Sequence, residues 1–205
     1  KALKYSDSII VLNDDFDILD HEIEIIEGFI ESSKNKIPIE YMLHEAAFYG
    51  RNFYVDNRVL IPRDETELLI DILKNYYQKK DLKVVDLGTG SGCIAISIAL
   101  EIPKSIVLGV DKYLDALNVA TKNKHIHQVT NFHVKQSDWL SDINVYDFDV
   151  VISNPPYIDP TDKHLKDLIH EPKNALIAAD RGLSDIKKIS IQAYKKLKIG
   201  GILMF

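Results

Sequence analysis

Alternating glycines stand between a short apolar strand and a helix, and this arrangement limits the folds open to the chain. The run is Gly88-Thr89-Gly90-Ser91-Gly92; the expected strand 83–87 precedes it and the expected helix 94–100 follows. Glycines allow a positive φ and a close approach of ligand to backbone, and a helix start offers free N–H groups. Cys93 stands where the dinucleotide-binding pattern Gly-x-Gly-x-x-Gly has its last glycine, which disfavours a nicotinamide-linked dehydrogenase.

Strands and helices alternate on both sides of this turn. Further strands are expected at 105–110, 132–135, 148–152 and 202–205, and further helices at 64–76, 114–123 and 184–197. Such alternation predicts an α/β fold, a Rossmann-like doubly wound and mainly parallel sheet with helices on both faces. The last strand is unfinished at Phe205, so we expect additional C-terminal strands in the whole protein.

The first 60 residues have a different pattern. Leu19, Ile23, Ile26 and Ile30 recur at helical spacing, with Asp17 or Asp20 as a candidate cap. Pro38 ends that helix and can open a shorter one. Residues 48–60 are aromatic and β-branched around Gly50 and Asp56-Asn57, which predicts a hairpin. We therefore divide the chain into part of a helical domain at 1–46, a β-hairpin connector at 47–61 and the α/β domain at 62–205.

The helix that opens the α/β domain has its own start signal. Asp64 can cap it with Glu67 three residues later. Its expected apolar face consists of Leu68, Leu69, Ile72, Leu73 and Tyr76. Arg63 and Glu65 either border a ligand site or form an ion pair at this helix start.

Charge and cysteine content narrow the class of partner. The chain has 205 residues and a net charge of −6; residues 1–60 hold 6 basic and 12 acidic residues, and the remainder holds 19 of each. Nonspecific binding of nucleic acid needs clustered cations, which this distribution lacks. One cysteine, Cys93, excludes an internal disulfide and suits the cytoplasm. The seven histidines have no metal-ligand spacing, and no apolar run reaches the roughly 20 residues of a membrane span. The first residue is Lys1 rather than Met, so we expect preceding residues.

The run Asn154-Pro155-Pro156-Tyr157 ends the expected strand 148–152. Proline lacks the N–H of a sheet ladder and restricts the residue before it, so the strand stops at the edge where α/β sheets bind ligands. The Asn154 side-chain oxygen and the Pro155 carbonyl can accept both N–H groups of a planar amide or aryl-amine nitrogen. The two prolines hold that carbonyl rigidly, and Tyr157 can pack on a flat group. These four residues are our candidates for catalysis and substrate binding.

The strand, the glycine turn, the helix and the acidic end of the next strand together resemble the S-adenosylmethionine-dependent methyltransferases. The resemblance implies S-adenosyl-L-methionine as cofactor, with Asp111 at the ribose, Asp86 near the methionine moiety and Asp138 at the adenine. The implied cofactor-binding residues are Asp86, Gly88, Thr89, Gly90, Ser91, Gly92, Asp111, Asp138, Trp139 and Asn154. The Asn-Pro-Pro-Tyr run resembles the catalytic motif of amino-methyltransferases, which act on adenine N6 of DNA or RNA or on protein glutamine.

Further runs resemble the release factor glutamine methyltransferases. They lie at 38–41, 48–55, 59–67 and 171–183, and the most specific is Leu60-Ile61-Pro62-Arg63 followed by Glu65-Thr66-Glu67. Asp64 stands where that family commonly has proline. The resemblance implies a monomeric enzyme of translation termination, with an N-terminal domain for recognising its substrate protein. It would methylate N5 of the glutamine in the Gly-Gly-Gln motif of class 1 peptide chain release factors.

Two alternatives stay open. An adenine-N6 methyltransferase acting on DNA or RNA needs a basic surface that the charge count does not show. A non-catalytic cofactor-binding partner needs no intact run at 154–157, yet the run is intact.

Overall fold

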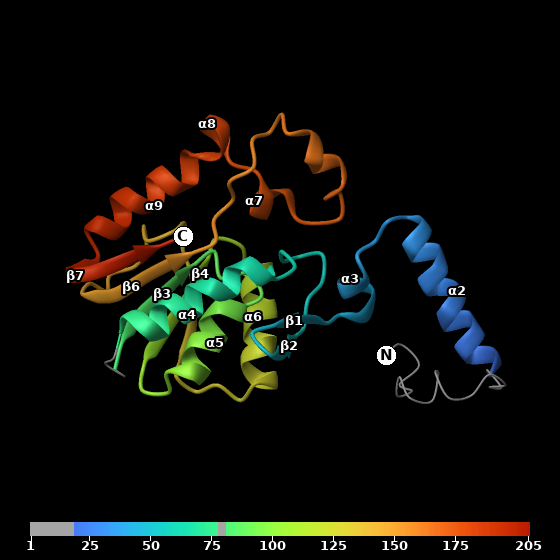
Figure 1. Ribbon diagram of the computed structural model, residues 1–205, viewed down its shortest axis with the longest axis horizontal. Coiled ribbons are helices and arrows are strands. Elements are labelled where there is room, and N and C mark those ends of the chain that lie inside the picture. The colour runs from blue at the N-terminus through green and yellow to red at the C-terminus, as the bar shows by residue number, and fades with distance from the viewer. Residues whose placement is uncertain (1–18, 78–80) are drawn as a thin grey trace.

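The computed structural model describes residues 19–77 and 81–205 (Figure 1). Within these residues, five parallel strands form one sheet in the order β5-β4-β3-β6-β7. The strands are β3 (Lys83–Leu87), β4 (Ile106–Asp111), β5 (Phe132–Gln136), β6 (Phe148–Ser153) and β7 (Leu197–Met204). The chain enters the sheet at its centre, moves to one edge and then continues on the other side of β3. This is the predicted doubly wound order.

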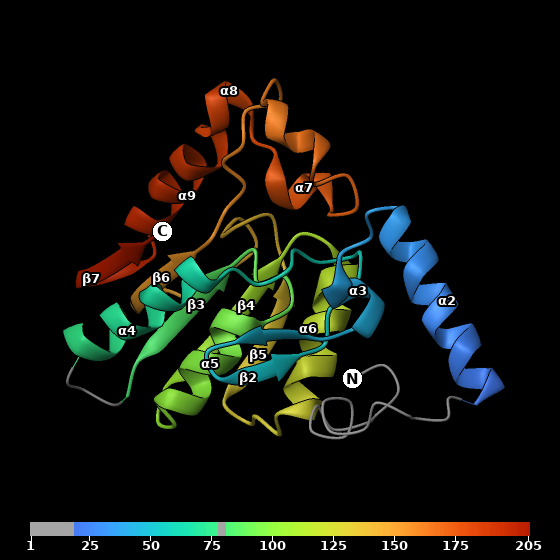
Figure 2. The same ribbon diagram turned by 45° about the vertical axis from the view of Figure 1, so that its right-hand side comes forward.

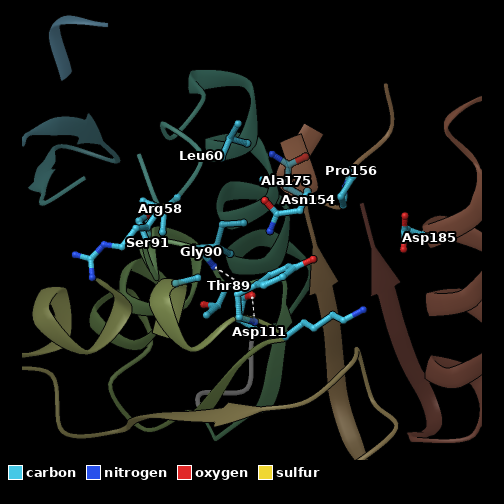
Figure 3. Close-up of a pocket in the computed structure, with 18 of the residues that line it drawn as sticks. Arg58, Leu60, Thr89, Gly90, Ser91, Asp111, Asn154, Pro156, Ala175 and Asp185 are labelled. Atoms are coloured by element: carbon cyan, nitrogen blue, oxygen red, sulfur yellow. Dashed lines mark hydrogen bonds between the residues drawn. The ribbon is translucent and has the colours of Figure 1, made fainter. Parts of the chain in front are cut away.

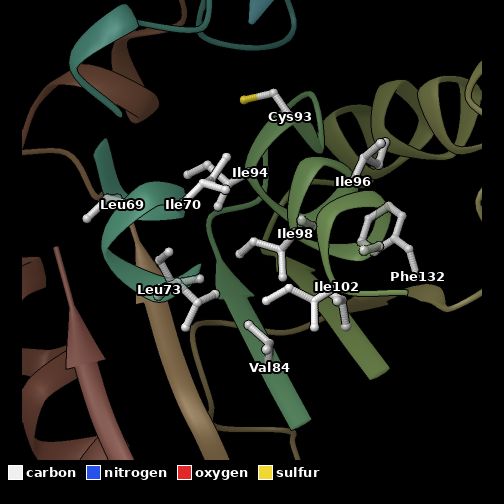
Figure 4. Close-up of a cluster of buried hydrophobic side chains, with 14 of the residues drawn as sticks. Leu69, Ile70, Leu73, Val84, Cys93, Ile94, Ile96, Ile98, Ile102 and Phe132 are labelled. Atoms are coloured by element: carbon white, nitrogen blue, oxygen red, sulfur yellow. The ribbon is translucent and has the colours of Figure 1, made fainter. Parts of the chain in front are cut away.

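Helices cover both faces of the sheet, as predicted. On one face lie α4 (Glu67–Tyr76), α5 (Cys93–Glu101) and α6 (Leu114–Ile126), and on the other lies α9 (Ser184–Tyr194). Side chains alternate across the strands. Val84 packs with α4 and α5, whereas its neighbour Val85 packs with α9. Figure 4 shows the first of these two cores, in which residues of α4 and α5 meet Val84 and Phe132.

The central strand pair sets the edge at which loops from two halves of the sheet meet. Strands β3 and β6 are paired in parallel with Leu87 opposite Ser153. The Ser153 hydroxyl also donates a hydrogen bond to the Leu87 carbonyl at 2.7 Å. Both strands therefore end at the same level, and the glycine turn and Asn154 leave the sheet side by side.

The N-terminal segment stands apart from the sheet (Figures 1 and 2). It contains α2 (Asp20–Lys34) and α3 (Ile39–Leu43), and Pro38 directly precedes α3 as predicted. Asp17 lies outside the described residues. Asp20 is not the cap: Leu19 holds that position, and its N–H bonds the Glu22 carboxylate at 3.0 Å. The predicted apolar stripe of α2 is largely exposed.

The hairpin is shorter than the predicted connector. It pairs β1 (Ala46–Phe48) with β2 (Arg51–Phe53) around Tyr49 and Gly50, both of which have positive φ. Such a turn suits a two-residue hairpin loop. Residues 54–63 then run on to the α/β domain without a strand assignment.

One prediction about α4 is wrong, and another is right only in part. Residues Asp64–Thr66 form a 3₁₀ turn (η1), so Asp64 caps nothing, and the Glu67 carboxylate accepts the Tyr49 N–H instead, at 2.6 Å. The buried face comprises Leu69, Ile70 and Leu73, whereas Leu68, Ile72 and Tyr76 are exposed. The helix carries two apolar stripes, and the packing of α5 selects one of them.

Short elements fill the connection between β6 and α9. They are η2 (Lys163–Lys166), α7 (Lys173–Leu176) and α8 (Ala179–Gly182). Among the residues that the structure describes, we find no helix that is both long and apolar enough to cross a membrane.

Asn123 of α6 fastens the connector to the α/β domain. This fully buried amide accepts the Tyr54 N–H at 2.7 Å and donates to the Tyr54 carbonyl at 2.9 Å. It also donates to the carbonyl of Ser91 in the glycine turn at 2.8 Å. One side chain thus satisfies three backbone groups from two distant segments.

We expect Asn123→Ala to lower the free energy of unfolding by roughly 2–4 kcal/mol, because it leaves buried backbone groups without partners. Urea denaturation of both proteins measures the change. Asn118→Ala, on the exposed side of the same helix, is the control, with an expected change within about 0.5 kcal/mol. Equal effects of the two substitutions would contradict the anchoring role of Asn123.

Candidate functional site

The carboxyl ends of β3, β4 and β6 open into a cavity of about 390 Å³. Figure 3 shows Thr89, Gly90 and Asp111 on one side of it and Asn154 with Ala175 on another. Nine of the predicted site residues line it: Gly88, Thr89, Gly90, Ser91, Asp111, Asp138, Trp139, Asn154 and Pro156. The position is the switch point of the sheet, where ligands of this fold class bind.

The glycine turn lies against the end of β4. Gly88 has a φ of +69°, and its N–H donates to the Val110 carbonyl at 2.8 Å. A side chain at Gly88 would come within 3.3 Å of the Trp139 ring, so glycine lets that ring pack onto the turn. Gly92 also has a positive φ but does not line the cavity; it begins α5 against Ile96 and Ala120.

Asp111 joins the turn to the strand end. One carboxylate oxygen accepts the Gly90 N–H at 3.1 Å, and the other accepts the Tyr113 N–H at 3.0 Å. Burial raises the pKa of this carboxyl, while these backbone N–H groups act to lower it. Each oxygen keeps further accepting capacity toward the cavity, which a pair of hydroxyl donors can use.

Asp86 lies behind the turn and does not line the cavity. It is fully buried, and one carboxyl oxygen accepts the Thr89 hydroxyl at 2.7 Å. The other oxygen has no hydrogen-bond partner among the described residues. Burial raises the pKa of Asp86 to about 7, and the negative charge of Asp111 adds to the rise, whereas the Thr89 bond opposes it. The family resemblance implies a place for Asp86 near the methionine moiety, and the structure places it beneath Thr89, outside the cavity lining.

The far end of the cavity contains an ion pair that the sequence did not indicate. Lys188 of α9 donates to the Asp138 carboxylate at 2.7 Å, and both residues line the cavity. Trp139 follows with a φ of +56°, which turns its ring toward Gly88. Fifty positions separate Lys188 from Asp138, so no local pattern could have revealed the contact.

A second cavity of about 490 Å³ adjoins the first. Pro155 and Tyr157 line only this one, and Tyr157 is well exposed. Five residues line both cavities: Leu60, Ile61, Arg63, Asn154 and Ala175. The run Asn154-Pro155-Pro156-Tyr157 therefore divides between two spaces, with Asn154 at their common boundary.

Two segments, one within residues 59–67 and one within residues 171–183, build the wall that the two cavities share. Buried Glu171 accepts from Arg63 Nη2 at 2.6 Å and from the Ile61 N–H at 3.2 Å. This pair fastens the segment around Ile61 and Arg63 to the segment that leads into α7, which carries Ala175. Arg63 thus lines both cavities and also forms an ion pair, but its partner is Glu171 rather than a residue at the helix start. Glu65 is exposed and lines neither cavity.

Residues 180–183 pack against the end of the run Asn154-Pro155-Pro156-Tyr157. Asp180, Arg181 and Gly182 all have positive φ, which makes a left-handed turn against Tyr157. A side chain at Gly182 would collide with the Tyr157 carbonyl oxygen. Glycine is therefore required for the loop after Pro156 to occupy its position.

The described residues of the site favour neither a cysteine nucleophile nor a bound metal ion. Burial raises the pKa of the Cys93 thiol to about 12, so this cavity-lining sulfur stays protonated and weakly nucleophilic. Among residues 19–77 and 81–205, no group of three or more histidine, cysteine, aspartate or glutamate side chains is arranged to hold a metal ion.

Comparison with known proteins gives the family. Residues 64–204 match the family model described as the methyltransferase small domain. The release factor glutamine methyltransferase of Escherichia coli K12 is 34% identical over 189 residues, which cover 91% of this chain and 68% of that protein. The enzyme of the same name from Shewanella oneidensis is 37% identical over 87% of this chain and 63% of its own length. The chain belongs to the release factor glutamine methyltransferase family.

A third family member, from Francisella tularensis, is 41% identical and shares 81% of this chain. The chain spans 60% to 68% of the length of these three relatives. Among solved structures, the ribosomal protein L11 methylase of Lactobacillus delbrueckii superposes with a TM-score of 0.52 at 17% identity, covering 73% of this chain and 63% of its own. At that identity the likeness supports the α/β methyltransferase fold alone.

The raised pKa of Asp86 predicts a specific pH dependence of stability. The unfolded chain loses this proton near pH 4 and the folded protein near pH 7, so the folded state binds more protons between these values. Its contribution to stability therefore falls as pH rises from about 4 to about 7 and stays constant above. Asp86→Asn removes this term, so the variant gains stability relative to wild type over that window.

Urea denaturation at several pH values measures the difference between the two proteins. Asp81→Asn, a change at an exposed carboxylate, is the control and should follow wild type. A difference between wild type and Asp86→Asn that stays constant from pH 4 to pH 8 would contradict the raised pKa.

Proposed function

We propose that this chain transfers a methyl group from S-adenosyl-L-methionine to a glutamine side chain of a protein. The acceptor would be N5 of the glutamine in the Gly-Gly-Gln motif of class 1 peptide chain release factors. The observation that carries the proposal is the position of Asn154, which lines both a cofactor-sized cavity and an adjoining cavity for an acceptor. Family membership supports the choice of acceptor.

The first cavity fits a nucleoside cofactor. Its volume of about 390 Å³ lies within the range of roughly 300–1,000 Å³ typical of ligand pockets. The bare backbone of Gly88 and Gly90 leaves room on one wall, and Asp111 offers acceptors for ribose hydroxyls. Asp138 and Trp139 would hold the adenine at the far end. When bound, S-adenosylmethionine supplies an electrophilic methyl group carried on a sulfonium.

The chain's own residues would make an amide nitrogen reactive by orienting it. Such a nitrogen is a weak nucleophile because its lone pair is delocalised into the carbonyl. Neither Asn154 Oδ1 nor the Pro155 carbonyl accepts a hydrogen bond from a described residue. Both can therefore bind the two N–H groups of the acceptor and direct its lone pair toward the first cavity. Because the prolines hold the carbonyl in place, the acceptors need little rearrangement during reaction.

The charge of the acceptor cavity supports a protein substrate over a nucleic acid. Its ionisable lining groups are Glu40, Asp167 and Glu171 against the single cation Arg63, which Glu171 already neutralises. A phosphate backbone would meet uncompensated negative charge there, whereas binding of nucleic acid depends on neutralising phosphates with cations. We take the enzyme to be a cytoplasmic monomer without a nucleic-acid partner.

We expect the full-length enzyme to transfer labelled methyl from S-adenosylmethionine to a release factor, at the glutamine of the Gly-Gly-Gln motif. Mass spectrometry of the peptide locates the methyl group. Asn154→Ala should lower the rate on the order of 10²-fold, as for other lost transition-state hydrogen bonds. Asn144→Ala, at an exposed asparagine outside both cavities, should match wild type. Label on DNA or RNA with none on the factor would refute the proposal in favour of an adenine-N6 methyltransferase.

Asp111→Ala should weaken cofactor binding by roughly 10- to 100-fold, because a charged acceptor for ribose hydroxyls is lost. Calorimetric titration with S-adenosylhomocysteine measures the affinity without turnover. Asp115→Ala, an exposed carboxylate in the first turn of α6, serves as the matched control. Unchanged affinity of Asp111→Ala would refute the ribose role.

A further inference from the structure

Thr66 occupies the capping position of α4 but does not cap the helix. A threonine there normally accepts an N–H from the first turn, yet its side chain makes no such bond. Its hydroxyl oxygen instead accepts a hydrogen bond from Asn154 Nδ2 at 3.2 Å, across 88 positions of sequence. Both side chains line the first cavity, so this contact joins the connector side of the site to the acceptor motif.

The Asn154 carboxamide has two different faces, and only one suits an N–H donor. Its oxygen can accept a hydrogen bond from the amide that is to be methylated, whereas its NH₂ group can only donate one. If the carboxamide rotated by half a turn, NH₂ would face NH₂ and no hydrogen bond could form. In the productive orientation, Nδ2 therefore lies on the side away from the substrate amide and needs a hydrogen-bond acceptor there. Thr66 Oγ1 is the acceptor that the structure provides.

We propose that Thr66 is a positioning residue for Asn154: its hydroxyl oxygen accepts from Nδ2 and holds the carboxamide in place, while the N–H of the substrate amide selects the orientation in which Oδ1 faces it. The inference rests on the proposed methyl transfer to an amide. It also gives a role to the family-like run at 59–67, because the Thr66 N–H bonds the Arg63 carbonyl at 3.0 Å. Arg63 is in turn fixed by Glu171. The orientation of Asn154 thus depends on a segment that supplies no group to the chemistry itself.

The kinetic test compares Thr66→Val with Thr66→Ser in the full chain. Valine keeps the shape of threonine but cannot accept a hydrogen bond, so we expect kcat to fall roughly tenfold, the effect of one lost hydrogen bond. KM for the release factor and affinity for S-adenosylhomocysteine should stay unchanged. Serine restores the hydroxyl and should return kcat to within about threefold of wild type. Thr130→Val applies the same chemical change at an exposed site and should have no effect.

Three kinetic outcomes would overturn the inference. Unchanged kcat in Thr66→Val would show that Asn154 needs no such partner. Weaker binding of S-adenosylhomocysteine at unchanged kcat would make Thr66 a cofactor contact instead. Equal losses in the valine and serine variants would show that restoring the hydroxyl does not restore kcat, so the hydrogen bond to Asn154 would not be what Thr66 contributes.

Nuclear magnetic resonance tests the contact without any acceptor protein. The side-chain NH₂ signals of Asn154 are identified by their absence from Asn154→Ala. We expect them to shift and to exchange faster with water in Thr66→Val but not in Thr66→Ser. If the wild type fails to methylate a release factor but Thr66→Val still shows this change, the contact stands and the proposed substrate is wrong. If the wild type is active and Thr66→Val matches it in both kcat and these signals, the inference alone is wrong.

Discussion

The parallel pairing of β3 with β6 is the constraint on which the site depends. It sets Leu87 opposite Ser153, and the Ser153 hydroxyl adds a bond to the Leu87 carbonyl at 2.7 Å. The glycine turn and Asn154 follow these two residues directly, so their neighbourhood is decided by strand register rather than by loop flexibility. A shift of one residue would exchange the two faces of β6 and would move Asn154 out of line with the end of β3. The register of the hydrophobic interior therefore also fixes the geometry of the two cavities.

The connector completes the site from outside the sheet. It is held at separate points by Asn123 through Tyr54, by Glu171 through Ile61 and Arg63, and by the Tyr41 hydroxyl on the Val59 carbonyl at 2.6 Å. Between these anchors, Leu60, Ile61 and Arg63 form the wall common to both cavities. A methyltransferase domain alone would leave this side open. The similarity of the run at 59–67 to the family thus has a physical basis in shaping the boundary between the two cavities.

Local sequence signals predicted the elements and most of the lining of the first cavity. Hydrophobic patterning with glycine and proline punctuation placed four strands of the sheet within one residue of their bounds, and the ends of strands located the site. The fifth prediction was too short, because β7 begins at Leu197, where the preceding helix was expected to end. The errors in α4 share one cause, which is contact between residues far apart in the chain. Asp64 would cap a helix in isolation, but Glu67 is drawn to Tyr49 and the helix starts later. The face of α4 was ambiguous because two apolar stripes compete, and only α5 decides between them.

Three of the eight non-glycine residues with positive φ in the described part of the chain lie in or next to a wall of the two cavities. Trp139, Asp180 and Arg181 all have positive φ although none is glycine, and such conformations cost energy that surrounding packing must offset. Each one has an identifiable consequence. Trp139 turns its ring onto Gly88 at the first cavity, and the turn through Asp180 and Arg181 brings Gly182 against the Tyr157 carbonyl. That contact immobilises the chain just after the two prolines, so the Pro155 carbonyl is restrained from both sides. Strain in α8 therefore contributes to the rigidity of the chain that follows Asn154.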